Sequence, residues 1–318
     1  MGRSERTDVS FPSHGETCAG WHLTGEGDAF AGDRGRPCVV MAHGFGGTMD
    51  AGLLPFAEAF AEAGLDVLLF DYRCFGDSTG EPRQFAWPSR HRDDYKAAVE
   101  FARGLDGVDP ERIVLWGTSW SGGHIVYVAA DDPRIAAVIS QTPDLDGVAT
   151  LRHLGQYAGI RQQLELTLRG ARDAVRMLRG QDPLMIPTVG PPGTLAGMSS
   201  EEAEPGMQAI AGPTWRNEVT GRAVFAEWTN RAITKIEKVR CPILVLIADR
   251  DSIAPAAAAR AAAWRAKGRV EVRDYPCLHF DIYVGEGRER SIADQLHFMR
   301  RHLDAVKAGE PVALSSQA

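Results

Sequence analysis

The 318-residue sequence contains little cysteine, no long apolar run and no excess of positive charge. Its five cysteines lie far apart, are odd in number and form no Cys-x-x-Cys pair. A disulfide framework or a zinc site is therefore not expected, and a reducing compartment fits best. No apolar stretch reaches the roughly 18 residues needed to span a bilayer, which argues against a membrane partner. The net charge of −7 likewise argues against nucleic acid as a partner.

Other absences narrow the location and the chemistry. The first residues contain no apolar segment of the secretory type, so we expect a cytoplasmic protein. Asp77, Asp249 and Asp281 are not spaced as a metal cage, and neither a metal nor an organic cofactor is expected. What remains is an ordinary globular composition, 44% hydrophobic and 24% charged. The chain is long enough for one large α/β domain with an insertion.

Apolar runs of strand length alternate with amphipathic segments along the first half of the chain. Residues 37–42 and 66–71 are short continuous apolar runs, as expected of strands buried on both faces. This alternation predicts a mostly parallel sheet wound with helices on both faces. The other elements predicted here are a polar arm at 1–14, a weak early strand at 16–24, helices at 51–63 and 90–105, and strands at 113–116 and 134–140.

The alternation stops at about residue 143. From there to residue 236 the sequence has no clean strand, and the stretches 151–179 and 215–236 have a helical pattern. We therefore predict that residues 143–236 form a mainly helical cap inserted into the core. The remaining predictions are a core built from 1–142 and 237–306, strands at 242–248 and 270–275, a closing helix at 291–306, and a loose tail at 307–318.

The predicted strand at 113–116 ends in small residues that open a helix. Ser119 lies there between Gly117 and Ser121, in the pattern small-x-Ser-x-small. A sharp turn from strand to helix would lift the Ser119 hydroxyl out of the sheet and expose it to a cleft. It would also place the Trp120 N–H at a helix start, where free amides favour an anion. Taken alone, the pattern is equally compatible with an ordinary strand–turn–helix junction.

A serine hydroxyl is a poor nucleophile at neutral pH and needs a base that a third group orients. Asp251 follows the predicted strand at 242–248, and His279 follows the strand at 270–275. With Ser119, both lie past the carboxyl ends of strands, where open α/β sheets place their sites. The order serine, acid, histidine predicts the triad Ser119–Asp251–His279.

Each partner has an alternative. Asp249 and Asp251 are also typical turn residues, and His279 could be a structural histidine. His43 is a rival base, but it precedes the serine in the chain and is expected to brace the loop at 43–47. That loop is rich in glycine, so its backbone can approach the reacting carbonyl. The predicted oxyanion hole is therefore the amide of Phe45 together with that of Trp120.

These motifs occur together and in a fixed order: residues 43–47, 71–78 and 117–122, the turn at Asp251, and residues 279–283. The combination resembles the α/β-hydrolase superfamily over nearly the whole chain, and it implies the α/β-hydrolase fold with an inserted helical cap. The cap segments at 186–196, 203–206 and 215–219 resemble a subgroup that includes fungal polyketide transferases and uncharacterised bacterial hydrolases. Cys74 and Ser121 depart from the pattern because glycine is usual there, and Ser121 is expected to tighten the turn.

The resemblance implies an acyl-enzyme on Ser119 and a bulky or lipophilic acyl group. We therefore expect a serine hydrolase that cleaves a carboxylic ester, thioester or lactone with a hydrophobic or polyketide-like acyl part. Two alternatives keep the triad: an acyl transferase or carboxylate-eliminating lyase of secondary metabolism, and a slowly turning over ligand-binding protein. The expected partner is a small acyl substrate, and the oligomeric state stays open, a homodimer included. Candidate substrate-binding residues of the cap are Met185, Trp215 and Trp228.

Overall fold

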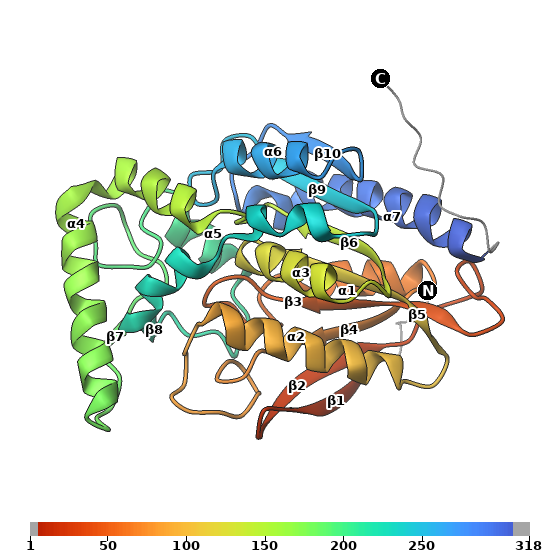
Figure 1. Ribbon diagram of the computed structural model, residues 1–318, viewed down its shortest axis with the longest axis horizontal. Helices are drawn as coiled ribbons and strands as arrows, with labels where there is room; N and C mark the ends of the chain where they lie inside the picture. Colours follow the sequence, from red (N-terminus) through yellow and green to blue (C-terminus); the bar gives the residue numbers. More distant parts are fainter. Residues whose placement is uncertain (1–5, 308–318) are drawn as a thin grey trace.

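The computed structural model describes residues 6–307, with the side chains of 157–158 and 304–307 left aside. The loose tail predicted at the end of the chain therefore lies outside the described residues from 308 onward. Within the described part, helices cover both faces of one large sheet (Figure 1).

The sheet has eight strands in the order β1-β2-β4-β3-β5-β6-β9-β10. The pairs β1–β2 and β2–β4 are antiparallel, whereas every other neighbouring pair is parallel, as the alternation of elements predicts. The strands are β1 (Arg6–Ser13), β2 (Glu16–Leu23), β3 (Arg36–Ala42), β4 (Asp66–Phe70), β5 (Val108–Thr118), β6 (Ile135–Gln141), β9 (Ile243–Ala248) and β10 (Val270–Tyr275).

The central strands are apolar because both of their faces are covered. Every residue of β4 and of β9 is buried. Helices α1 and α7 pack on one face, and α2, α3 and α6 pack on the other, each with its own apolar cluster. The carboxyl ends of the parallel strands consequently meet at one edge, where loops carry the polar side chains. The helices are α1 (Leu54–Glu62), α2 (Pro88–Arg103), α3 (Trp120–Asp131), α6 (Ala256–Arg265) and α7 (Gly285–Lys307).

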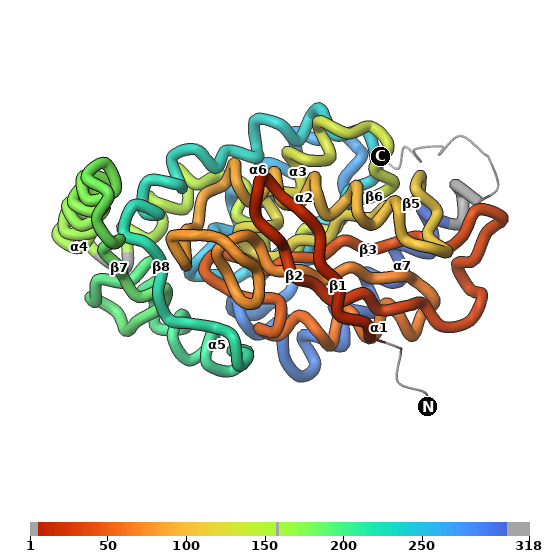
Figure 2. The backbone as a smooth tube through the Cα atoms, turned by 90° about the horizontal axis from the view of Figure 1, so that it is seen from below, coloured from red at the N-terminus to blue at the C-terminus, as the bar shows by residue number. Residues whose placement is uncertain are grey.

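The segment between β6 and β9 adds no strand to this sheet. Figures 1 and 2 both show its helix α4 and the short strands β7 and β8 at one end of the molecule, beyond the large sheet. Helix α4 is kinked at Gly159, whose φ is 74°. The elements are α4 (Gly147–Leu178), β7 (Met185–Ile186), α5 (Ala203–Ile210), β8 (Val219–Thr220) and the 3-10 helices η1 (Gly221–Thr229), η2 (Ala232–Thr234) and η3 (Ile236–Lys238); η4 (Asp281–Tyr283) follows β10.

Two predictions about local structure are wrong. Residues 6–13, expected as a polar arm, form β1, because Phe11 packs between Phe70 and Phe101 with ring centroids 5.5 and 5.4 Å away. The stretch 215–236, expected as a helix, instead contains β8, the 3-10 helices η1 and η2, and the first residue of η3. Helix α6 was not predicted, because its alanine-rich sequence has no distinct apolar face.

Candidate active site

The sharp turn predicted around Ser119 is present between β5 and α3. Ser119 has φ 55° and ψ −121°, a conformation that non-glycine residues rarely adopt and that is typical of functional positions. Glycine is required at 117, since a Cβ there would lie 2.6 Å from the carbonyl oxygen of Ser121. The Ser121 hydroxyl accepts a hydrogen bond from the Thr118 amide at 2.8 Å and lies 2.9 Å from the Ala42 carbonyl oxygen of β3. Through these contacts the turn packs against β3, the neighbouring strand.

The predicted acid and base lie side by side. His279 Nδ1 is 2.6 Å from Asp251 Oδ2, and both side chains are only 2% exposed. The second oxygen, Asp251 Oδ1, accepts the amides of Ile253 at 2.8 Å and Ala254 at 2.7 Å. The loops after β9 and β10 position this pair at the carboxyl edge of the sheet.

The charge around His279 favours its protonated form. Burial lowers the pKa of the imidazole, but the charge and hydrogen bond of Asp251 and the charge of Glu202 outweigh it, so the net pKa shift is upward. Ser119 and His279 border the same small cavity, which Gly44 and Phe45 also line. The turn, the histidine and the glycine-rich loop thus meet at one place.

The glycine-rich loop after β3 approaches the serine closely. A Cβ at Gly44 would lie 2.9 Å from the Cβ of Ser119, so only glycine fits there. The Phe45 ring packs edge-on against Trp120, with centroids 5.2 Å apart. The Trp120 amide belongs to the first turn of α3, where helical N–H groups have no acceptor within their own helix.

His43 lies in this loop but is engaged differently from His279. Its Nδ1 donates to the Gly44 carbonyl oxygen at 2.9 Å, and its ring packs edge-on against Tyr72 at 4.7 Å. Burial lowers its pKa to about 4. The ring is therefore neutral and contacts the backbone of its own loop, whereas the bracing role predicted for it stays a prediction.

Comparison with known proteins identifies the family of this chain. Residues 37–286 match the family described as the alpha/beta hydrolase fold. The chain belongs to the α/β-hydrolase family. The quorum-quenching protein AidA of Acinetobacter baumannii is 36% identical over 296 residues, which are 92% of this chain and 94% of AidA. Polyketide transferase af380 of Aspergillus fumigatus is 30% identical over 305 residues, 94% of this chain and 99% of the relative.

A solved structure shares the fold of this α/β-hydrolase. The crystal structure of the alpha/beta hydrolase GrgF from Penicillium superposes with a TM-score of 0.77 at 24% identity, covering 94% of this chain and 99% of GrgF. The predicted resemblance to the α/β-hydrolases, and to the subgroup that includes fungal polyketide transferases, is confirmed. The predicted fold is confirmed as well.

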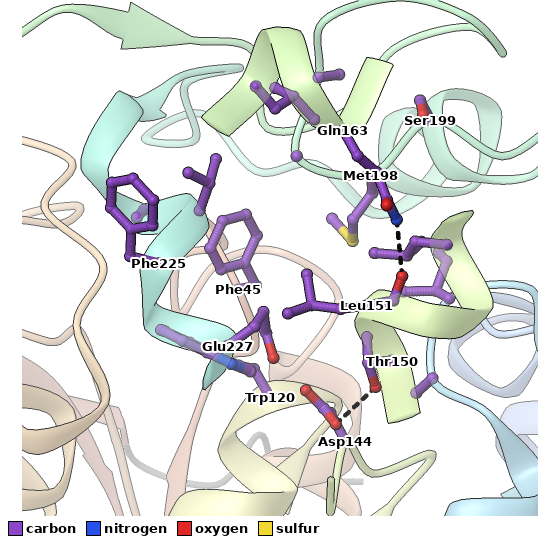
Figure 3. A pocket seen from close by; sticks show the side chains of 18 of the residues that line it. Phe45, Trp120, Asp144, Thr150, Leu151, Gln163, Met198, Ser199, Phe225 and Glu227 are labelled. Atoms are coloured by element: carbon purple, nitrogen blue, oxygen red, sulfur yellow. Dashed lines mark hydrogen bonds between the residues drawn. The ribbon is translucent and has the colours of Figure 1, made fainter. Parts of the chain in front are cut away.

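A larger cavity of about 250 Å³ adjoins Ser119 on the side of α4 (Figure 3). Its walls are mostly apolar and come largely from α4, residues 196–199 and η1. Of the three substrate-binding candidates, Trp228 borders this cavity, whereas Met185 and Trp215 do not. Met185 pairs with Thr220 in the small sheet, and the Trp215 indole N–H donates to the Gly46 carbonyl oxygen at 2.9 Å.

Glu202, at the start of α5, is a residue of this α/β-hydrolase that sequence analysis missed. Its Oε2 accepts the His279 amide at 2.7 Å, and its Oε1 accepts the Ser252 amide at 2.8 Å and the Ser252 hydroxyl at 2.5 Å. One buried carboxylate therefore joins the loop of Asp251 to the loop of His279. In the sequence it is one of two adjacent glutamates before a helix, a pattern that gives no sign of this role.

Within residues 6–307, no group of three or more His, Cys, Asp or Glu side chains is arranged to hold a metal ion. None of the helices in the described part of the chain is both long and apolar enough to cross a membrane.

Proposed function

We propose that this α/β-hydrolase is a serine hydrolase that cleaves a carboxylic ester, thioester or lactone through an acyl-enzyme on Ser119. The observation that carries the proposal is the buried Asp251–His279 pair, 2.6 Å apart, on the cavity that Ser119 borders. A base oriented by a carboxylate next to a serine held in an uncommon backbone conformation is the arrangement that nucleophilic catalysis requires.

The chemistry has two halves. His279 Nε2 takes the proton of Ser119 as the hydroxyl oxygen attacks the substrate carbonyl, and Asp251 stabilises the imidazolium that forms. The amides of Phe45 and Trp120 donate to the oxyanion, and such donors lower the barrier by roughly 2.7–4 kcal/mol each. His279 then returns the proton to the leaving oxygen or sulfur. In the second half, water gives a proton to His279 and attacks the acyl carbonyl. His279 then returns that proton to Ser119 Oγ as the carboxylic acid leaves.

The larger cavity supports a hydrophobic acyl group. Its volume is about 250 Å³ and its walls are mostly apolar, which suits a group that binds by excluding water. We propose that residues 143–236 act as the cap that roofs this cavity, because α4 and η1 form much of its wall. The name of the relative af380, a polyketide transferase, supports a polyketide-like acyl part.

Acyl transfer is the second candidate. The same acyl-enzyme would be attacked by an alcohol or amine in place of water, with His279 again taking the proton. The name of af380 favours this outcome, since a transferase and a hydrolase differ only in the group that attacks the acyl-enzyme.

The test is covalent labelling with a fluorophosphonate probe, read by intact mass, followed by a panel of p-nitrophenyl esters and acyl thioesters. Wild type and the exposed-serine control Ser10→Ala should each gain one adduct. Ser119→Ala should gain none and lose turnover on the order of 10⁶-fold. Labelling or turnover in purified Ser119→Ala at more than a few per cent of wild type would reject Ser119 as nucleophile. Product analysis with added alcohols separates hydrolysis from transfer.

A further inference from the structure

The part of α4 after the kink at Gly159 runs along one end of the molecule, with β7 and β8 on its inner side (Figures 1 and 2). Its inner face is packed closely against η1. A Cβ at Gly170 would lie 2.6 Å from Val224 Cγ2. The buried Asp173 carboxylate pairs with Arg222 at 2.8 Å. Helix α4 is therefore held in place from within, and its opposite face points away from η1.

That outward face carries a row of apolar side chains. Residues three and four apart lie on the same side of a helix, and the members of this row follow one another at these steps. Its five large members are between 44% and 81% exposed. A continuous apolar row of this kind on a protein surface indicates an interaction site. The row, called here the α4 stripe, consists of Ile160, Leu164, Leu168, Ala171, Val175 and Leu178.

From Leu164 onward the α4 stripe has the spacing of a coiled-coil seam. The steps alternate between four and three residues, through Leu168, Ala171 and Val175 to Leu178. A seam of this spacing fits another helix with the same spacing. A second copy of α4 supplies such a helix, and a two-fold axis lets one surface serve both partners.

The two edges of the α4 stripe differ in charge. Helical spacing places four charged residues along one edge, whereas the other edge has the uncharged Gln163, Thr167 and Ala174. The charged edge consists of Arg161, Glu165, Arg172 and Arg179.

This difference selects the orientation of the two helices. An antiparallel pair brings the two charged edges together, because the axis turns one helix end for end. With Leu168 opposite Ala171 of the other copy, Glu165 comes nearly level with Arg172 of that copy, and the axis repeats the pair. A parallel pair would set each charged edge against an uncharged one, so neither Glu165 would meet an arginine.

We propose that α4 pairs antiparallel with α4 of a second copy of this chain, so that the two α4 stripes cover each other and Glu165 of each copy pairs with Arg172 of the other. The surface is confined to one helix per copy, so the interface is of the small class and association should be reversible at micromolar concentrations. No member of the α4 stripe borders the two cavities beside Ser119, so the inference is independent of the proposed function.

A lipid surface is the other occupant that a basic amphipathic helix could fit. A helix that lies in a bilayer interface needs its apolar face turned to the lipid and its cations free to reach head groups on both sides. Here the cations lie along one edge only, and that edge includes Glu165. The charge pattern therefore favours a second copy.

The first experiment is sedimentation velocity of the wild-type protein between about 1 and 200 μM. The mass should rise with concentration from 34.5 kDa towards twice that value. Leu168→Glu would bury a charge at the centre of the pair and should weaken the dimer by more than about 100-fold. Trp264→Glu makes the same kind of change at an exposed residue of α6 and should leave the dimer unchanged.

The second experiment tests the register with charge reversal. Glu165→Arg and Arg172→Glu each set like charges against each other twice, so each dimer should weaken by about tenfold. The double variant should restore the wild-type affinity. An equimolar mixture of the two single variants should also form dimers, because every contact then joins opposite charges; mixing would not repair a misfolded chain.

Several results would overturn the inference. A wild-type mass that stays at 34.5 kDa over the whole range would reject the dimer, and a dimer that persists in Leu168→Glu would reject α4 as its interface. Charge variants that the mixture does not rescue would reject the antiparallel register. Co-sedimentation of a monomeric wild type with vesicles of phosphatidylcholine and phosphatidylglycerol, lost in Leu168→Glu, would assign the α4 stripe to a lipid surface instead.

Discussion

Replacing Glu202 by glutamine should uncouple the acid loop from the base loop. The carboxylate accepts two backbone amides, those of Ser252 and His279, and the Ser252 hydroxyl. Glutamine keeps the shape of the side chain, but its single oxygen accepts only one of the two amides, and its NH₂ group faces the other. The substitution also removes a negative charge that raises the pKa of His279.

The size of the effect follows from these contacts. One buried amide left without an acceptor lowers the free energy of unfolding by about 1–3 kcal/mol. A shift of the His279 loop by a fraction of an ångström should lower kcat by about 10- to 100-fold, because a 1 Å misplacement costs roughly 10². Without the Glu202 charge, the pKa of His279 falls. A general base acts in its unprotonated form, so the acidic limb of the kcat/KM profile should move to lower pH.

The assay is kcat/KM for a p-nitrophenyl ester between pH 5 and 9, together with urea unfolding, for Glu202→Gln and Glu201→Gln. Glu201 is exposed and adjacent, so its variant makes the same charge change without touching either loop and should behave as wild type. A Glu202→Gln enzyme that is destabilised but keeps its pH profile would refute the electrostatic part of the reasoning. One that changes in neither respect would refute the brace between the loops altogether.

Three further outcomes are expected. Asp251→Asn should lower kcat by up to about 10⁴-fold, because the amide presents the wrong hydrogen-bonding group to the imidazole. Asp249→Asn should leave kcat nearly unchanged, because Asp249 contacts the exposed Arg260, and equal losses of kcat in the two variants would contradict Asp251 as the acid. Among straight-chain p-nitrophenyl esters, kcat/KM should rise from acetate to hexanoate by about two orders of magnitude, at roughly 0.8 kcal/mol per buried methylene, and a steady fall from acetate would contradict an apolar acyl cavity. Burial lowers the pKa of His43 to about 4 and the pKa values of His91 and His124 well below 6.5, so these histidines take up protons at a higher pH in the unfolded chain than in the folded one. Their contribution to the free energy of unfolding is fully present above about pH 6.5 and should be lost as the pH falls towards 4, by up to about 1.4 kcal/mol per pH unit for each histidine. Urea unfolding at each pH measures this loss, and a free energy of unfolding that does not change with pH would contradict it.

The core could be predicted from the sequence because its central strands are continuous apolar runs. The run predicted at 242–248 is β9, Ile243–Ala248, and the run predicted at 37–42 lies within β3. Such runs favour strands that are buried in a sheet covered on both faces. The strand β1 escaped prediction because only one face is buried, so Phe11 stands among polar residues.

Some residues of the candidate site could also be predicted from the sequence, and others could not. Ser119, Asp251 and His279 were predicted because each follows a recognisable strand, and the structure brings Asp251 and His279 into contact; their catalytic roles stay predictions. Glu202 could not be predicted, because the role of a polar residue in an irregular segment depends on the surface that it is folded against. Trp215 does not border the larger cavity, and its indole N–H donates to the Gly46 carbonyl oxygen instead; its role in substrate binding stays a prediction.

The hydroxyl of Ser121 matters for any redesign of this protein by consensus substitution. The motif that this chain resembles usually has glycine at that position, and substitutions toward such a motif are usually chosen because they stabilise. Here the fully buried hydroxyl accepts the Thr118 amide and contacts the Ala42 carbonyl oxygen, so the change would delete partners from two backbone groups beside the nucleophile. Ser121 departs from the motif in the sequence, but its hydroxyl supports the backbone of this turn. Ser121→Gly alone would leave the Thr118 amide without the acceptor that it has here.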